Sequence, residues 1–418
     1  MVDGMRTYCK ENLLRDREFC LEMVKKAFKG KWRRKNYQRA LAAYCNLPLR
    51  EVRSLIRQDR KDELEFGLYA IVDEFLKETE ERHLDLSPIE YKSRVDGLSG
   101  KTRVIGIMSV KQQCYEHIIV GALMPLFNAK ITPHQYASME GRGQVAGMRQ
   151  IQKWVRDDNW SVKCSEKFGN GYQRRCKHYV KLDVTQCFPS ISGETVMRFL
   201  SHDISKNDEL IWAVREIMKT HEAGGRGLVI GSLLSQFLCN YLLSFAYRFV
   251  MGLHKERRGK SVKLVHHALF FMDDLILIGS DRRNLKMAVR AMVEYVRRDL
   301  GLTIKPNWHI KCIDDEPIDM MGYVIHDDGH VTVRARIFLR ARRAFLKAAR
   351  RTMNIGFAHR LMAYHGYFVH TATRSLREKL NVTKIKRKAC RFIRRVDRRK
   401  EKPLYGQCNP VHRRICFA

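Results

Sequence analysis

The chain has 418 residues, enough for two or three subdomains, and 45% of them are hydrophobic, as in an ordinary globular protein. Lys and Arg number 79 against 45 Asp and Glu, which gives a formal net charge of +34. This excess indicates a polyanionic partner, with nucleic acid first and an anionic membrane surface as the alternative. The twelve cysteines contain no Cys-x-x-Cys pair, and no segment has the pattern of a signal peptide or a membrane span. We therefore expect free thiols and a cytoplasmic protein without a membrane partner.

The apolar spacing predicts elements in the following order. Residues 1–95 are expected to be mostly helical, and a glycine-containing turn at 97–100 leads into a strand at 102–107. Helices are expected at 111–127 and 144–157, a strand at 179–184, a helix at 194–219, a glycine-rich loop at 224–231, a helix at 232–250, a hairpin at 264–279 and a helix at 282–299. This order favours an α+β domain built on a small antiparallel sheet.

The end of the chain is strongly basic. Residues 331–418 carry 25 Lys and Arg against 3 Asp and Glu, a net charge of +22. Phe338, Phe345 and Leu346 lie among arginines at helical spacing, which predicts amphipathic helices with a cationic face. We expect this region to follow phosphates without reading sequence.

Two adjacent carboxylates, Asp273 and Asp274, interrupt an apolar run of residues 270–278. Asp is a poor strand former, so the pair predicts the turn of a hairpin. An acidic surface turn is one interpretation. The other is a divalent metal site, because two neighbouring buried carboxylates resist joint ionisation unless a cation compensates them.

A third carboxylate, Asp183, stands at the end of the predicted strand at 179–184. This strand and the hairpin can bring Asp183, Asp273 and Asp274 to one sheet edge. Oxygen ligands suit Mg²⁺, and two ions about 3.5–4 Å apart suit nucleotidyl transfer. Together with the basic charge, the three carboxylates indicate polymerisation on nucleic acid.

The chain resembles the palm of reverse transcriptases. The segment from Asp183 to Phe188 is similar to the first palm motif, and residues 271–274 (Phe-Met-Asp-Asp) are similar to the aromatic-x-Asp-Asp motif. Five further segments resemble family motifs in the right order: residues 101–105, 136–143, 230–236, 301–305 and 321–323. The resemblance spans about residues 95–330. It implies a right-hand polymerase fold with a helical N-terminal extension (1–95), fingers and the start of the palm (96–178), the palm (179–330) and a basic helical thumb with its tail (331–418).

The resemblance also implies a role for individual residues. Asp183, Asp273, Asp274 and the backbone carbonyl of Val184 would bind two Mg²⁺ ions, for which Mn²⁺ can substitute, and Lys305 would protonate the leaving pyrophosphate. Residues that would contact the incoming nucleotide are Lys101, Arg103, Phe188, Ile230, Gly231 and Gln236, and the primer grip would be Met321, Gly322 and Tyr323. A solvated surface position is the alternative for Arg103 and Lys305, and a helix-start glycine is the alternative for Gly231. A bulky ring at Phe188 would collide with a 2′-hydroxyl, which favours a DNA product.

Ile230 and Gln236 indicate which branch of the reverse transcriptase family the chain resembles. Most reverse transcriptases have Gln-Gly-x-x-x-Ser-Pro in this motif, whereas the Ile-Gly-x-x-x-Ser-Gln form resembles the enzymes of diversity-generating retroelements and some abortive-infection (phage-defence) relatives. Loss of a polar Gln beside the nascent base pair predicts reduced fidelity. The partners that this implies are an RNA template, expected to be a cognate noncoding RNA, a DNA or RNA primer and dNTPs, with an accessory protein or a second copy of the chain left open.

Three functions remain open from the sequence. The first is a templated reverse transcriptase for diversification or antiviral defence. The second is a template-independent or protein-primed DNA polymerase with the same palm. The third is a non-catalytic RNA-binding scaffold, which the three intact carboxylates disfavour.

Overall fold

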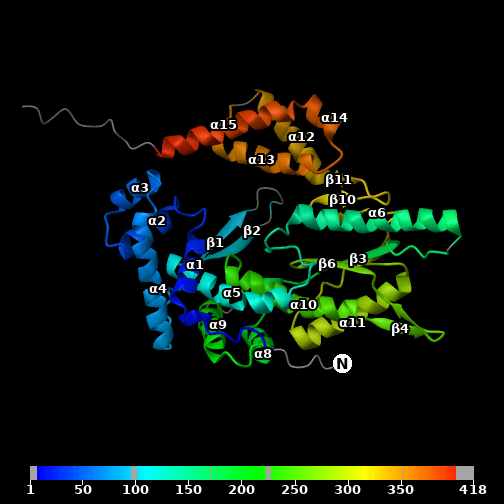
Figure 1. The fold of residues 1–418 in the computed structure, drawn as a ribbon. Helices are drawn as coiled ribbons and strands as arrows, with labels where there is room; N and C mark the ends of the chain where they lie inside the picture. Colours follow the sequence, from blue (N-terminus) through cyan, green and yellow to red (C-terminus); the bar gives the residue numbers. More distant parts are fainter. Residues whose placement is uncertain are drawn as a thin grey trace, which may run out of the picture. The chain divides into compact units, whose positions relative to one another are not determined.

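The computed structural model describes residues 7–95, 100, 102–169, 171–222, 227–350 and 352–401, with side chains up to 396. The chain forms two compact units, one of residues 1–321 and 325–329 and one of residues 322–324 and 330–418. Figure 1 labels the elements along the chain.

The first unit begins with short helices and a hairpin. These are η1 (Leu13–Arg15), α1 (Arg17–Phe28), α2 (Lys35–Tyr44), α3 (Leu49–Arg57), η2 (Asp62–Leu64), α4 (Glu65–Glu80), and the antiparallel strands β1 (Glu90–Val95) and β2 (Thr102–Ile107). Helices α1, α4 and α10 (Leu233–Met251) all pack on α5 (Val110–Lys130), most of whose apolar residues are fully buried. The prediction of a mostly helical segment is therefore correct between residues 13 and 80, whereas 90–95 is a strand.

A four-stranded antiparallel sheet forms the centre of the first unit. Its strands are β3 (His178–Asp183), β6 (His267–Phe271), β7 (Asp274–Gly279) and β8 (Ile310–Cys312), in the order β6-β7-β3-β8. Helices α10 and α11 (Arg282–Leu300) pack on one side of it, and α6 (Gln144–Phe168) packs on the other (Figure 1). Because helices cover both sides, residues 275–279 of β7 are all buried, and the strand is a continuous apolar run without alternation.

The remaining elements of this unit connect or extend the sheet. They are α7 (Cys187–Ser190), α8 (Gly193–Asp203), α9 (Asp208–Glu222), the hairpin strands β4 (His254–Arg257) and β5 (Lys260–Lys263), and β9 (Ile318–Met320). The predicted single helix at 194–219 is two helices. Asn207 separates them because its side-chain oxygen accepts a hydrogen bond from Leu210 N (3.0 Å), while its amide donates to Cys9 O (2.9 Å).

The second unit contains most of β10 (Tyr323–Ile325), β11 (Val331–Val333), α12 (Ala335–Arg350), α13 (Ile355–Val369), α14 (Arg374–Lys379) and α15 (Val382–Glu401). The core of its helices includes Phe345, Leu361 and Phe368, and the rings of Phe345 and Phe368 stack 5.7 Å apart. No helix in the described part of the chain is long and apolar enough to cross a membrane.

Candidate active site

The central sheet brings the three predicted carboxylates together at one end. Asp183 ends β3 and is the register partner of Asp274, which begins β7. Asp273 lies in the two-residue turn between β6 and β7, after Met272, whose φ of +53° is uncommon for a residue with a Cβ. The backbone N–H of Val184 donates to Asp273 O (3.1 Å), so the turn is tied directly to the end of β3.

Electrostatic repulsion among these carboxylates is visible at Asp273. Burial raises the pKa of Asp273, and the nearby charges of Asp274 and Asp183 raise it further, while Arg103 opposes the shift. The side chain still reaches solvent, but the protein atoms around its carboxylate are enough to disfavour the charged form. A bound cation would relieve this cost.

Lys305 supplies the nearest positive charge. Its Nζ lies 2.7 Å from Asp183 Oδ1, and its backbone N–H donates to Asp183 O (2.9 Å). Asp183 raises the pKa of Lys305. The lysine predicted to protonate pyrophosphate is therefore held against Asp183, on a segment that also pairs through Thr185 N and Thr303 O (2.8 Å).

The donor set fits Mg²⁺ without forming a closed cage. Among the described residues, no three His, Cys, Asp or Glu side chains form a ready-made metal cluster. Asp183 Oδ1 is enclosed and receives no hydrogen bond of normal geometry, although the Lys305 ammonium is nearby. Carboxylate oxygens are the donors that Mg²⁺ prefers, and this ion usually keeps waters and substrate phosphates as its other ligands. An open set of three carboxylates is compatible with that preference.

The predicted nucleotide contacts come from several elements. Arg103 is exposed on β2, and Phe188 is half-buried on α7 directly after the β3 end. Ile230, in the turn before α10, and Gln236, in its first turn, are both half-buried. Lys101 and residues 223–226 of the glycine-rich loop lie outside the described residues.

Gly231 is required by its contact with β2. It has a φ of +119°, and a Cβ there would lie 2.5 Å from Gly106 O. Gly106 N donates to Ile230 O (2.8 Å), so the 230–231 loop and the strand that carries Arg103 touch backbone to backbone. This contact explains why a glycine stands here, and the predicted contact of Gly231 with the incoming nucleotide stays a prediction.

The residues predicted as the primer grip have buried side chains. Met321 and Tyr323 are 6% and 2% exposed, Met321 packs on Gly147, and Tyr323 lies 5.2 Å from Tyr367, ring to ring. Gly322 has a φ of +86°. The role of these three residues as a primer grip stays a prediction.

Two features escaped the sequence analysis. Arg94 on β1 is the register partner of Arg103, so two guanidinium groups share one face of the hairpin. Like charges in direct opposition are destabilising unless an anion joins them, which makes Arg94 a second candidate for phosphate contact. Recognising residues 90–95 as a strand would have revealed it.

The second feature is a buried polar network behind the 230–236 loop. Glu116, on α5, is fully buried and accepts hydrogen bonds from Ser232 Oγ (3.0 Å) and Leu233 N (2.8 Å) at the start of α10. His221 is also fully buried, with Nε2 3.8 Å from Glu116 Oε1 and Nδ1 3.4 Å from Ser235 Oγ. A carboxylate at a helix N-terminus is favourable, so Glu116 fixes the loop from inside the protein. The available signal was that Glu116 is the only acidic residue of α5 and precedes the apolar run at 118–120.

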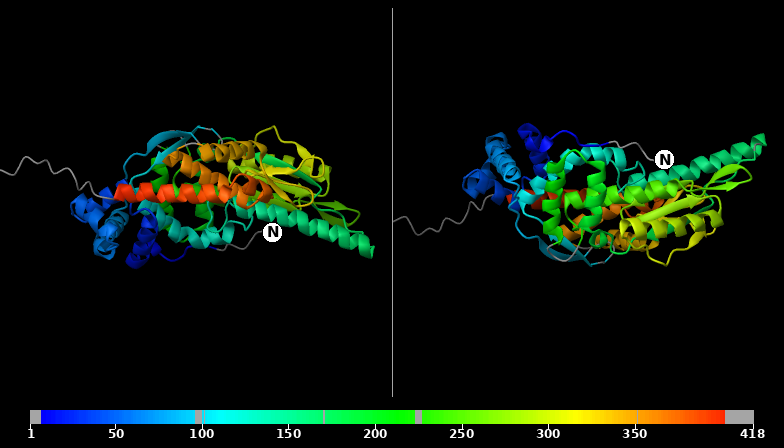
Figure 2. Two further views of the ribbon diagram at one scale, coloured as in Figure 1. Left: turned by 90° about the horizontal axis from the view of Figure 1, so that it is seen from above. Right: turned by 90° about the horizontal axis from the view of Figure 1, so that it is seen from below.

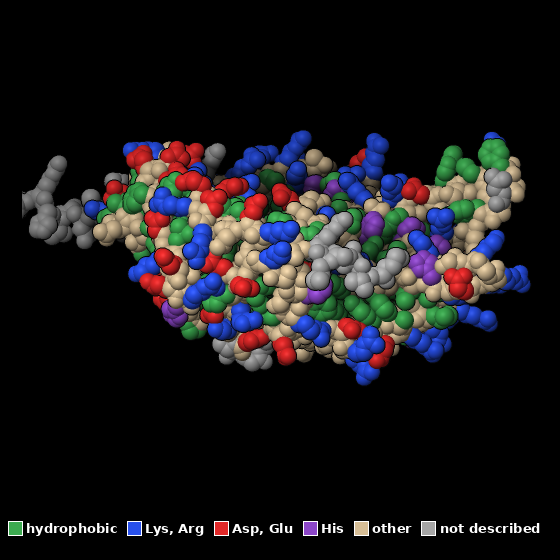
Figure 3. All heavy atoms as spheres, turned by 60° about the horizontal axis from the view of Figure 1, so that its bottom comes forward, with side chains coloured by type: hydrophobic (Ala, Val, Ile, Leu, Met, Phe, Trp, Pro, Cys, Tyr) green, Lys and Arg blue, Asp and Glu red, His purple; other side chains and the backbone are tan. Residues whose placement is uncertain are grey.

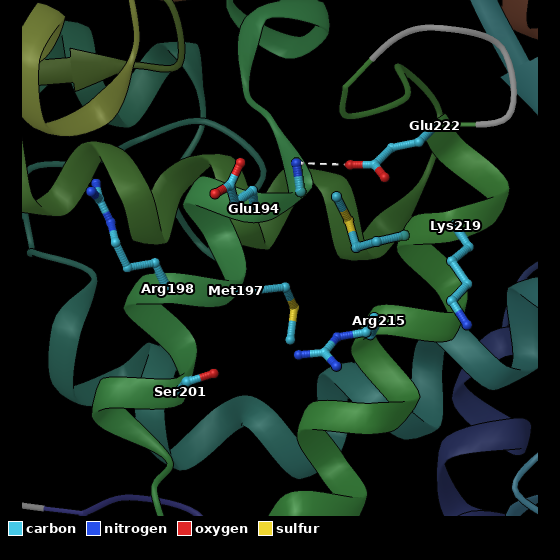
Figure 4. A pocket seen from close by; sticks show the side chains of 9 residues that line it. Glu194, Met197, Arg198, Ser201, Arg215, Lys219 and Glu222 are labelled. Atoms are coloured by element: carbon cyan, nitrogen blue, oxygen red, sulfur yellow. Dashed lines mark hydrogen bonds between the residues drawn. The ribbon is translucent and has the colours of Figure 1, made fainter.

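A separate hollow of about 410 Å³ lies between α8 and α9 (Figure 4). Its lining combines cations and carboxylates: Glu194, Arg198, Arg215, Lys219 and Glu222, with Met197 and Met218. One carboxylate oxygen of Glu222 is already used, because it accepts a hydrogen bond from Gly193 N (2.9 Å). None of the predicted site residues lines this hollow, and its mixed charge does not indicate a particular ligand.

Comparison with known proteins gives a family match. Residues 91–325, more than half of the chain, match the family model described as reverse transcriptase (RNA-dependent DNA polymerase). No curated protein sequence matches the chain. The small antiparallel sheet and the family match confirm the predicted α+β class and right-hand polymerase fold.

The solved structures to which the chain is similar include telomerases of two Candida species. The apo telomerase of Candida tropicalis is 12% identical with a TM-score of 0.46, and the match covers 73% of this chain and 57% of that one. A telomerase of Candida albicans, solved with a TWJ fragment of telomeric RNA, is 12% identical with a TM-score of 0.42, over 69% and 55% of the two chains. The present chain thus spans somewhat more than half the length of these telomerases.

Proposed function

The chain belongs to the reverse transcriptase family of RNA-directed DNA polymerases, and we propose that Asp183, Asp273 and Asp274 form the centre at which it extends a DNA strand on an RNA template. The observation that carries this proposal is the register of β3 and β7, which sets Asp183 opposite Asp274 beside the turn that holds Asp273.

Asp183, Asp273, Asp274 and the carbonyl of Val184 would hold two Mg²⁺ ions, for which Mn²⁺ can substitute. When bound, such ions stabilise negative charge on the attacking and leaving oxygens. Because the pKa of Asp273 is raised, ionising all three carboxylates without a bound cation costs free energy.

The chain's own residues would position the other reactants. Arg103 and Arg94 share one face of the β1–β2 hairpin, where two guanidinium groups suit triphosphate oxygens. Gly106 and Gly231 fix this hairpin to the loop that carries Ile230. Lys305 would move from Asp183 to the pyrophosphate. There it would neutralise negative charge or donate a proton to the leaving oxygen.

Phe188 would select deoxynucleotides. Its ring lies against the core on a four-residue helix directly after the β3 end, which limits how far it can retreat from a 2′-hydroxyl. Phe188→Ala should therefore raise incorporation of NTPs relative to dNTPs. Equal discrimination by both proteins would remove Phe188 from this role.

The experiment that tests the proposed reaction is primer extension by the full chain with and without an RNA template. We expect a DNA product that requires the template, a DNA or RNA primer, dNTPs and Mg²⁺. Product without a template would favour a template-independent or protein-primed polymerase. A protein that binds RNA but extends nothing under any of these conditions would be a scaffold.

The biological setting that we propose rests on Ile230 and Gln236, which resemble the retroelement and phage-defence branch. In either setting the template would be a cognate noncoding RNA in the cytoplasm, with an accessory protein or a second copy of the chain as a further partner. Sequencing of the RNA that copurifies with the protein from its native host tests this. Recovery of one discrete RNA from a neighbouring gene supports the proposal, and recovery of bulk cellular RNA contradicts it.

A further inference from the structure

The outer face of α6 carries a row of cations. The inner face of the helix is buried, and its Trp154 ring stacks on His267 of β6 with ring centroids 4.7 Å apart. The opposite face carries five exposed basic residues, whose spacing of three, four or seven places them on one side of the helix: Arg149, Lys153, Arg156, Lys163 and Lys167. The row runs from residue 149 to residue 167, a rise of about 27 Å along the helix.

Two exposed aromatic side chains accompany this row. Trp160 is 69% exposed and Phe168 is 66% exposed, and Trp160 is the most exposed large hydrophobic residue of the described chain. Lys167 Nζ lies 5.5 Å from the centroid of the Phe168 ring. In Figure 3, hydrophobic side chains and Lys or Arg side chains lie exposed close together at the upper right. Open aromatic faces beside cations are the arrangement on which unpaired bases stack.

The cations of this row are free to meet a polyanion. In the described part of the chain, no ion pair involves Lys153, Lys163 or Lys167, although Asp157 is only four residues from Lys153. Arg156 donates its Nε to Gly329 O (3.2 Å) and keeps its other donors. Unsatisfied like charges on one helix face repel each other, and phosphate groups would offset that repulsion.

The face leads away from the carboxylates. Near its start, Gly147 packs beside Tyr136, whose N–H bonds to Phe270 O at the catalytic end of β6. Trp154 stacks on His267 at the opposite end of the same strand. The helix then continues for fourteen residues, about 21 Å, and both views of Figure 2 show it running out past the sheet.

A membrane is a poor match for this surface, because the apolar side of α6 is already buried against the sheet and only two rings remain. We propose that the outer face of α6 is a second RNA-binding surface. It holds a single-stranded stretch of RNA, with bases stacked on Trp160 and Phe168 and phosphates paired with the five cations. The choice of RNA over other polyanions rests on the proposed function, whereas the surface itself does not depend on catalysis.

The test measures binding of the full chain to a fluorescein-labelled 20-nucleotide single-stranded RNA by anisotropy at several salt concentrations. Trp160→Ala should weaken binding about tenfold, and Trp160→Phe should restore most of it because stacking is retained. The triple variant Lys153→Glu, Lys163→Glu, Lys167→Glu should weaken binding further and reduce the slope of log affinity against log salt by about 2.

The matched control is the triple variant Arg283→Glu, Lys286→Glu, Arg290→Glu on the exposed side of α11, which changes the net charge equally. We expect it to bind RNA within about twofold of the wild type after correction for net charge. An equal loss in both triple variants, or no loss in the α6 variants, would overturn the proposal. Loss of binding to phosphatidylserine vesicles, with RNA binding kept, would assign the face to a membrane and would also overturn it.

Primer extension on a short template separates this proposal from the proposed function. The α6 variants should keep extension of a short primer–template at wild-type rate, since they do not touch the carboxylates. If the wild type binds the RNA through α6 but extends no primer, the proposed function fails while the RNA surface stands.

Discussion

Replacing Glu116 by Gln tests whether the loop at 230–236 is held from inside the protein. Glu116 is fully buried, and its Oε2 accepts hydrogen bonds from Ser232 Oγ and Leu233 N at 3.0 and 2.8 Å. The substitution keeps the size of the side chain and removes its charge. Any effect therefore reports on the negative charge that Glu116 places beside the N-terminus of α10 and beside His221.

The expected loss of stability follows from these contacts. A hydrogen bond to a charged group is worth roughly 1 kcal/mol more than a neutral one, so the two short bonds lose about 2 kcal/mol together. The charge at the N-terminus of α10 contributes about 1 kcal/mol more. Burial of a neutral amide costs less than burial of a carboxylate, which offsets part of this loss. We expect a net decrease of about 2 kcal/mol in the free energy of unfolding.

Two assays read the effect. Urea unfolding measures the stability, and primer extension over a range of dNTP concentrations measures KM for the nucleotide. We expect KM to rise about tenfold in Glu116→Gln, because a loop displaced by a fraction of an ångström misplaces Ile230 and Gly231. Glu209→Gln is the matched control: this carboxylate is 5% exposed and accepts hydrogen bonds from Arg15 and Asn12. It should lose comparable stability and keep KM, and an equal rise of KM in both variants would refute the reasoning.

Three further predictions concern single residues. Gly231→Ala should lower the free energy of unfolding by about 3 kcal/mol, because a Cβ there would meet Gly106 O at 2.5 Å with φ at +119°. In the same urea titrations Gly366→Ala should not destabilise, because a Cβ added there would meet no other part of the protein within 4 Å. A tolerated Gly231→Ala would contradict the account. Ile230→Gln should lower the misincorporation frequency measured by sequencing the DNA product, and an unchanged spectrum would rule out Ile230 as a determinant of fidelity. Burial, then the charge of His266, lowers the pKa of His267 to about 4, so between pH 6.5 and 4.5 the unfolded chain binds a proton that the folded chain does not. This group alone should then lower the free energy of unfolding by about 2 kcal/mol as the pH is reduced from 6.5 to 4.5. His267→Phe, which keeps a ring against Trp154, should remove that part of the fall in urea unfolding at the two pH values, and parallel losses in both proteins would contradict it.

Apolar periodicity predicted the buried elements well. The strand at 102–107 agrees with β2 at both ends, and the helices at 232–250 and 282–299 agree with α10 and α11 within one residue. Each of these elements packs at least one of its faces in the protein interior, so apolar residues recur along it at a regular spacing. The hairpin with Asp273 in its turn was predictable because two acids are unfavourable inside a buried strand.

Exposed elements were among those missed. Strand β1 has no buried residue and the β4–β5 hairpin is nearly as exposed, so neither carries an apolar alternation that a sequence pattern could reveal. Helix α6 continues eleven residues past the predicted end at 157, because its outer half packs on little and has no apolar period. The contact of Lys305 with Asp183 and that of Gly231 with Gly106 depend on strands far apart in the chain, which local spacing does not encode.

The central claim is that Asp183, Asp273 and Asp274 are the polymerase centre of this chain. The most direct measurement is incorporation of labelled dNTPs on a primed RNA template with Mg²⁺, by the wild type and by Asp273→Asn, with unfolding curves to show that the variant is folded. Asn keeps the size of the side chain and removes a charge that burial, Asp274 and Asp183 already disfavour, so the variant should be at least as stable as the wild type. We predict incorporation by the wild type and a loss of at least about a thousandfold in the variant, since an electrostatic contact made at the reacting oxygens is worth several kcal/mol. Incorporation by the folded variant at the wild-type rate would contradict the claim.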